Sequence, residues 1–218
     1  MMYQSCMPHS FDLSPLFAQL KALDATRRLA FGVCLFERAI PAFFQFQVDS
    51  GWPGGGVLRA ALAQAWTALE TGVAPSPYVS VEMCEAVLPD SEDHTSAFTS
   101  AAIDTVSIAC CVLTFIETGD VQQLVEAVEA RRDTIDLFIQ NRGLHSADQN
   151  FEATISAHPL MQAELEFLHE DLAFLKATQG SQVWRATLEY VGANRWPRPH
   201  QLLEGGTTIG KVVLEGFH

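Results

Sequence analysis

The stretch LAFGVCLFERAIPAFFQF, residues 29–46, decides the fold class of this chain. Apolar residues recur along it at spacings of four and three, which is the period of a helix face that packs into a core. The recurring residues are Leu29, Val33, Phe36 and Ile40. Asp24 precedes the stretch as a helix N-cap, and Pro41 inside it should kink the helix or divide it. We therefore predict a long apolar helix at the centre of the protein.

A second apolar segment, near Thr95–Glu117, predicts another central helix. Between Thr95 and Ile116 its only formal charge is Asp104. The segment is long enough to span a bilayer, but serines and threonines dilute it and no basic cluster flanks it. An aspartate in the middle of a membrane helix would also cost roughly 2.5–3.5 kcal/mol on insertion scales. We expect a buried core helix here and no contact with a membrane.

The rest of the chain also shows helical periodicity and offers no alternating runs that would predict strands. Further helices are expected over about 16–20, 58–69, 81–87, 121–142, 146–157, 159–175 and 182–191, with a turn at GWPGGG, residues 51–56. No period of 20–50 residues repeats, which argues against a solenoid. The prediction is an all-α fold: one compact multi-helix bundle over residues 1–218 with two central apolar helices.

Both ends of the chain differ in composition from its middle. Residues 1–12 are expected to form a frayed N-terminal tail without the basic and apolar regions of a signal peptide. Residues 195–218 are rich in glycine and proline but contain Trp196 and Ile209, so we predict that this tail docks onto the helical body. Its basic residues Arg195, Arg198 and Lys211 could approach residues 120–175, which hold eleven carboxylates and three arginines.

The charge of the chain and its cysteines limit the classes of function that are possible. The 218 residues are 48% hydrophobic and 18% charged, with a formal net charge of −13. Such a charge repels phosphate, so a nucleic-acid reader or a binder of anionic membranes is not expected. The five cysteines are odd in number and lack a C-x-x-C pair, which argues against a disulfide framework or a zinc site. We predict a cytosolic protein with reduced cysteines.

Three charged residues interrupt the apolar helices: Glu37, Arg38 and Asp104. A buried charge costs several kcal/mol unless it is paired. Since residues 37 and 38 point about 100° apart on a helix, the simplest prediction is an Arg38–Asp104 ion pair between the two central helices. The three residues could be a structural polar core that fixes helix register, a polar pocket that binds a small ligand or performs acid–base chemistry, or charges that lie at the surface. Ser100 and Ser107 share the face of Asp104 and could supply hydrogen bonds.

Other candidate motifs are weak. Glu166-x-x-His169 matches half of a carboxylate-bridged two-metal site, but no second copy exists. Glu166 also belongs to an acidic face, with Glu164, Glu170 and Asp171, that we interpret as solvated. The glycine-rich turn lacks the Lys-Ser/Thr of a phosphate loop, and no nucleophile motif is present. We predict no metal and no cofactor, and we identify no catalytic residues.

Three segments, in order, resemble the bacterial family known as domain of unknown function 416, the YjaG-like proteins. They are residues 29–46 with the following 65–69 (AWTAL), the helix SAAIDTVSIACCV at 100–112, and HPLMQAE at 158–164 with a closing TTIG at 207–210. The string at 34–41 is the most specific part. The family usually closes with Ser-Asn-Ile-Gly, where this chain has Thr-Thr-Ile-Gly. The resemblance implies a compact, all-helical, cytosolic bacterial protein, and it implies no activity.

Two functional hypotheses follow. The first is a non-enzymatic helical protein that acts through protein contacts, most simply as a homo-oligomer, with the aromatic cluster of Phe43, Phe44 and Phe46 as a candidate interface. The second is a small-molecule-binding protein or enzyme built around Glu37, Arg38 and Asp104. A solvent-reachable cavity lined by those three residues would favour the second hypothesis, and a dry ion pair would favour the first.

Overall fold

A computed structural model describes residues 13–73, 75–76, 79–92, 96–141, 150–178 and 182–193. These residues form nine α-helices and no strand, so the predicted all-α bundle is confirmed. The two expected tails, 1–12 and 195–218, lie outside the described residues. The helices are α1 (Leu13–Ala22), α2 (Ala25–Ser50), α3 (Gly55–Thr71), α4 (Val81–Glu85), α5 (Thr99–Thr118), α6 (Val121–Gln140), α7 (Phe151–Ala157), α8 (Pro159–Ala177) and α9 (Val183–Gly192).

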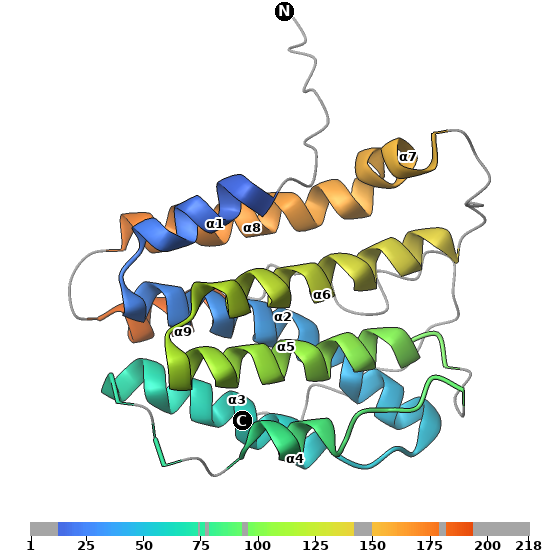
Figure 1. Ribbon diagram of the computed structural model, residues 1–218, viewed down its shortest axis with the longest axis horizontal. Coiled ribbons are helices and arrows are strands. Elements are labelled where there is room, and N and C mark those ends of the chain that lie inside the picture. The colour runs from blue at the N-terminus through green and yellow to red at the C-terminus, as the bar shows by residue number, and fades with distance from the viewer. Residues whose placement is uncertain are drawn as a thin grey trace, which may run out of the picture.

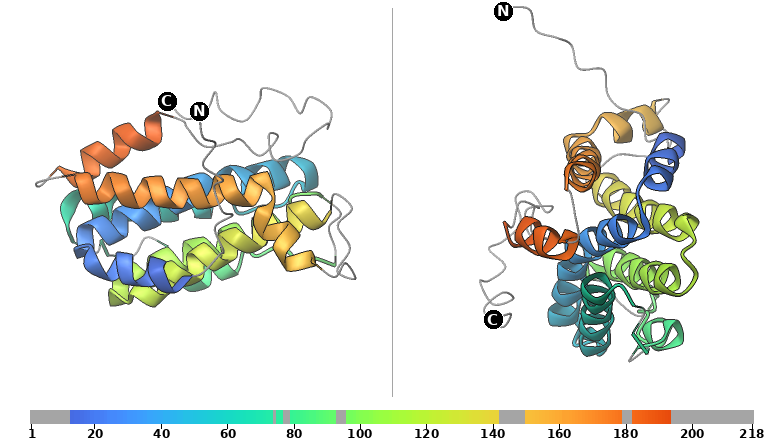
Figure 2. Two further views of the ribbon diagram at one scale, coloured as in Figure 1. Left: turned by 90° about the horizontal axis from the view of Figure 1, so that it is seen from above. Right: turned by 90° about the vertical axis from the view of Figure 1, so that its left-hand side faces the viewer.

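Helix α2 is the centre of the bundle, as the apolar stretch at 29–46 predicts. Sixteen of its 26 residues are buried, and it packs against α3, α5, α6, α8 and α9. Helix α5 is the second central helix and packs mainly against α2 and α6. The axes of the long helices are roughly aligned, and α5 and α6 are antiparallel. Helices α1 and α8 lie on one side, α3 and α4 on the other, and α2, α5 and α6 between them (Figures 1 and 2).

The helix ends follow the expected capping chemistry. The Asp24 side chain accepts a hydrogen bond from the backbone N–H of Arg27, and Asp120 accepts one from Gln122. Between α5 and α6, Gly119 adopts a left-handed conformation with φ of 70°, which ends α5 and turns the chain back. Pro41 does not divide α2, because the helix continues without a break to Ser50. Packing of α2 on five neighbours outweighs the one backbone hydrogen bond that Pro41 cannot donate.

Two of the described helices, α2 and α5, are long and apolar enough to cross a membrane by length and composition. In α2, 89% of the most apolar 18-residue window is buried inside the protein, and in α5 the share is 56%. Their apolar side chains therefore form the core of the bundle. The glycine at position 32 of α2 is part of that packing, since it lets α5 and α6 approach the α2 backbone closely.

Candidate functional site

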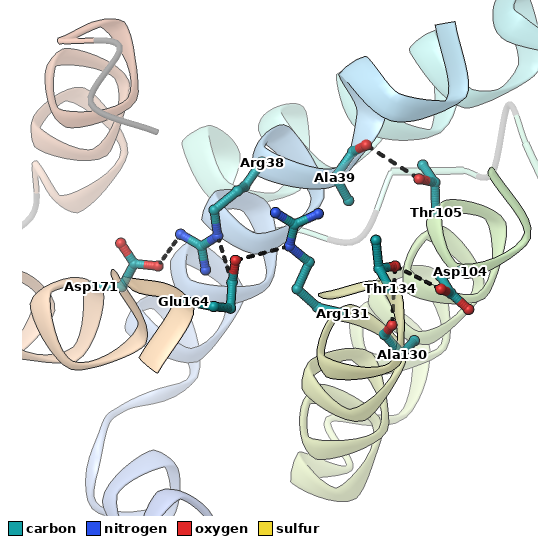
Figure 3. Close-up of polar contacts among 9 residues, drawn as sticks. All are labelled: Arg38, Ala39, Asp104, Thr105, Ala130, Arg131, Thr134, Glu164 and Asp171. Atoms are coloured by element: carbon teal, nitrogen blue, oxygen red, sulfur yellow. Dashed lines mark hydrogen bonds and ion pairs between the residues drawn. The ribbon is translucent and has the colours of Figure 1, made fainter. Parts of the chain in front are cut away.

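The structure separates the three charged residues that the sequence singles out. Arg38 points from α2 toward α8, Glu37 accepts a hydrogen bond from the indole of Trp66 in α3, and Asp104 accepts one from Thr134 in α6. The predicted Arg38–Asp104 ion pair is not formed (Figure 3). The physical reason is that α8 supplies two carboxylates to Arg38, so the arginine does not need Asp104.

The partners of Arg38 are Glu164 and Asp171, which lie two helical turns apart on α8. The Arg38 Nε atom lies 3.0 Å from Glu164 Oε1, and Nη1 lies 2.8 Å from Asp171 Oδ2. The second oxygen of Glu164 accepts from Arg131 of α6, whose Nε is 3.1 Å away. These four side chains form a buried ion network that joins α2, α6 and α8 (Figure 3). Two positive and two negative charges make it neutral.

Helix α9 extends the ion network through Tyr190. The Tyr190 hydroxyl donates a hydrogen bond of 2.7 Å to Asp171 Oδ1, the oxygen that Arg38 does not use. The Tyr190 ring also stacks on Phe174 of α8, with 4.1 Å between ring centroids. Every carboxylate oxygen of Glu164 and Asp171 thus has a donor from the protein itself. A carboxylate satisfied in this way is poorly suited to bind a ligand or to accept a substrate proton.

Burial and charge act in opposite directions on the pKa values of the ion network. Burial raises the pKa of Glu164, but attraction to Arg131 and Arg38 lowers it more, so this carboxyl stays ionised. Burial lowers the pKa of Arg38, and the attraction of Glu164 and Asp171 more than reverses that effect. For Asp171 burial is the larger influence, and its pKa lies above the ordinary value despite Arg38 and Tyr190. The ion network is therefore buried and internally paired, an arrangement that can hold helices in one register.

Asp104 of α5 is half-buried at the contact between α5 and α6, outside the ion network. Burial raises its pKa to about 6, while the hydrogen bond from Thr134 lowers it and the neighbouring Asp133 raises it further. The Thr134 Oγ1–Asp104 Oδ2 distance is 2.6 Å. Thr134 also lines a hollow of about 10 Å³, which is the room that one water molecule needs. Ser107, a predicted partner of Asp104, instead donates to the carbonyl of Ile103 in its own helix.

Glu37 lies at the α2–α3 contact and outside the ion network. Trp66 Nε1 donates to Glu37 Oε1 over 2.7 Å, and burial raises the pKa of this carboxyl. Glu37, Arg38 and Asp104 consequently face three different helices and do not line one pocket. Only Arg38 belongs to a polar core in the sense that the sequence suggests.

Sequence reasoning missed Arg131, Glu164 and Asp171. It interpreted Glu164 and Asp171 as part of a solvated acidic face, which is wrong: their exposed fractions are 2% and 0%. A signal was available in the helical period. Glu164 and Asp171 are seven residues apart and lie on either side of buried Leu168, and Arg131 occupies the same kind of position in α6 between buried Val128 and Ile135. Charges at core positions of two helices indicate mutual pairing.

The structure also locates the residues of the candidate interface and of the candidate metal motif. The aromatic cluster is buried, with exposed fractions of 0% for Phe43, 6% for Phe44 and 0% for Phe46. These side chains belong to the hydrophobic core and do not form a surface that a second chain could contact. Glu166 and His169 are exposed on α8. Among the described residues, no three His, Cys, Asp or Glu side chains cluster closely enough to hold a metal ion.

Comparisons with known proteins agree with the helical architecture. A family model described as "Protein of unknown function (DUF416)" matches residues 15–185. The crystal structure of a DUF416 family protein from Shewanella baltica OS155 superposes with a TM-score of 0.70 at 19% sequence identity, over 82% of this chain and 93% of that one. No curated protein sequence matches the chain. The matched residues include all four charged members of the ion network, Arg38, Arg131, Glu164 and Asp171, whereas Tyr190 lies beyond the matched region.

Proposed function

This chain belongs to the DUF416 family, and we propose that it acts through protein contacts, most simply as a homo-oligomer, without catalysis. One observation carries the proposal. The buried charged residues, which would be the natural place for an active site, form a closed ion network in which each carboxylate oxygen has a donor from the chain. The polar core thus supports the fold, and the surface is left to carry the function.

A small-molecule site is the second candidate, and one observation favours it. Asp104 is a half-buried carboxyl with a pKa raised to about 6, next to the hollow that Thr134 and Ser100 line. A carboxyl with that pKa is suited to acid–base work near neutral pH. Room for about one water molecule, however, is far below the several hundred Å³ of ordinary ligand pockets. We therefore rank this candidate second.

We also propose a cytosolic location in a bacterium. The four cysteines that the structure describes form no disulfide with one another, which suits a reducing compartment. The net charge of −13 further supports a protein partner, or a second copy of this chain, over a nucleic acid.

Native mass spectrometry of the full chain purified from its own host tests the proposal. We expect a mass that corresponds to two or more copies, or to a complex with another protein, and no small molecule that survives gentle desolvation. A monomer that retains a stoichiometric small molecule would contradict the proposal and favour the site at Asp104. The variant Asp104→Asn separates the two cases, because it should leave the assembly intact and would abolish retention of a ligand bound there.

A further inference from the structure

Two thiols face each other at the contact between α4 and α5, away from the ion network. Cys84 of α4 is completely buried, whereas Cys110 of α5 is only partly buried. The two thiol side chains lie close enough to influence each other's ionisation. Cys110 Sγ also lies 3.9 Å from the carbonyl oxygen of Val81, at the start of α4. The short helix α4 therefore lies with its thiol against that of α5.

The two thiols are chemically unequal. The hydrogen bond from Cys84 lowers the pKa of Cys110, whereas the same interaction together with burial raises the pKa of Cys84. The neighbouring Cys111 is also partly buried, but burial and the charge of Glu126 raise its pKa to about 12. Cys110 is also the accessible member of the pair, since Cys84 is completely buried. Because the thiolate is the nucleophile in thiol chemistry and must reach the small disulfide, we assign the attack to Cys110. Cys84, at its side, is placed to react in a second step.

We propose that Cys84 and Cys110 form a reversible disulfide by exchange with a low-molecular-weight disulfide of the glutathione type. In the first step the Cys110 thiolate attacks one sulfur of that disulfide, the S–S bond breaks, and one small thiol leaves. In the second step Cys84 loses its proton and attacks the Cys110 sulfur of the mixed disulfide, which releases the second small thiol. Two protein thiols are oxidised and one small disulfide is reduced to two thiols.

The bond would join two helices that already pack against each other. A disulfide needs its two Cα atoms about 4.4–6.8 Å apart, and α4 has only five residues. Ser80 caps its N-terminus and the chain turns at 86–88, so an adjustment of α4 toward α5 would involve one short helix. Once formed, the bond would fix α4 to the central helix. Oxidation would then rigidify the surface around Met83 and Leu88, which are 46% and 44% exposed.

Peptide mapping of the folded chain in glutathione redox buffers tests the site. The Cys6→Ser background removes the N-terminal thiol, and N-ethylmaleimide blocks free thiols at the end of the incubation. Trypsin cannot separate the two cysteines, since no Lys or Arg lies between Arg59 and Arg131. Cleavage after glutamate does separate them, into residues 83–85 and 93–117. We expect these two peptides to be linked at oxidising ratios and to be released by excess reduced glutathione.

Matched variants distinguish the roles of the three thiols. Cys111→Ser should form the same disulfide as the parent chain. Cys84→Ser should stop at the first step and accumulate one glutathione on Cys110, and Cys110→Ser should accumulate none on Cys84. Blocked thiols at the most oxidising ratio, a Cys110–Cys111 link, or glutathione on Cys111 in the Cys84→Ser variant would overturn the proposal. Far-UV circular dichroism of each sample checks that the helices are intact, and the parent chain alone decides the matter where a variant does not fold.

Discussion

Arg38 can occupy the core because two carboxylates reach it from α8. Taking the guanidinium out of water costs several kcal/mol, and the attraction of Glu164 and Asp171 in a region of low dielectric compensates for that cost. The same carboxylates need the arginine, since Asp171 has an exposed fraction of 0%. At the scale of single residues, the ion network is therefore cooperative: each member is tolerated only while the others are present.

A double-mutant cycle on Arg38 and Asp171 measures this cooperation. We expect Arg38→Met and Asp171→Leu each to lower the free energy of unfolding by about 3–5 kcal/mol, because each substitution leaves a buried charge without its partner. The double variant should lose less than the sum, with a coupling energy of about 1–3 kcal/mol. Urea midpoints measure the effect. The control cycle pairs Arg38→Met with Asp104→Leu, where no contact exists and the coupling should be near zero; a large value there would contradict the arrangement in Figure 3.

Asp104 predicts a pH dependence of stability. Its pKa is about 6 in the folded protein, above the ordinary value of 3.8, so the folded state binds more protons than the unfolded state between about pH 4 and 6. The contribution of Asp104 to stability is fully present below about pH 4 and is lost as the pH rises through 6. Asp104→Asn should therefore stabilise the protein at pH 7.5 by roughly 1–3 kcal/mol relative to the parent, and less at pH 5.

Urea unfolding at the two pH values measures that difference. Glu166→Gln, which removes one exposed carboxylate from α8, is the matched control for the loss of a single negative charge. If Asp104→Asn and Glu166→Gln respond equally to pH, the environment of Asp104 is not the cause.

How much of the site could be read from the sequence depends on the residue. Arg38 was identifiable because it and Glu37 are the two charges in the apolar stretch 29–46. Its partners were not, because Glu164 and Asp171 lie in a helix with many other carboxylates and look like members of a solvated face. Periodicity shows which face a residue occupies, but not which neighbouring helix faces it. The docking of α8 on α2, over more than 120 residues of sequence, is a tertiary contact that no local pattern specifies.

At the scale of elements, the close approach of α2 to its neighbours rests on Gly32. A Cβ atom added there would lie 3.0 Å from Leu124 Cδ2 in α6 and 3.3 Å from Val112 Cγ2 in α5. We expect Gly32→Val to destabilise the protein by about 1–3 kcal/mol through overpacking of a filled core. Thermal unfolding measures the loss.

Gly56 of α3 provides the matched control for Gly32. A Cβ atom at Gly56 would meet nothing within 4 Å. Gly56→Val should thus change stability by no more than about 0.5 kcal/mol, as substitutions outside the core do. Equal losses at the two positions would show that the effect comes from the helix backbone and not from the contact of α2 with α5 and α6.

The elements themselves were largely predictable. Caps at Asp24 and Asp120, the stop at Gly119 and the stripes of apolar residues locate most of the described helices to within a few residues. These signals are local, and local chemistry determines where a helix begins and ends. Pro41 is the exception: its local effect favours a break, and the burial of α2 on all sides overrides it.

At the scale of the whole molecule, the sequence predicts that the segment 195–218 docks onto the helical body. Burying Ile209 alone would stabilise the docked state by roughly 1.5–3 kcal/mol if the side chain is fully covered. Limited proteolysis with trypsin tests this, since Arg195 and Lys211 are cleavable sites in the segment, whereas Pro199 protects the bond after Arg198. We expect slow cleavage at both and a lower melting temperature after cleavage. Rapid cleavage with an unchanged melting temperature would show that the segment does not dock.

The ion network also bears on how the chain is made in the cell. Glu164 lies 126 residues after Arg38. A ribosome releases the N-terminal helices first, so a growing chain that ends with α6 already contains both arginines of the core and neither of their carboxylates. Its helices can associate, but the guanidinium groups of Arg38 and Arg131 have to stay in contact with water until α8 leaves the ribosome. Helix α8 thus completes the interior, and the native core cannot close before residues 159–177 have left the ribosome.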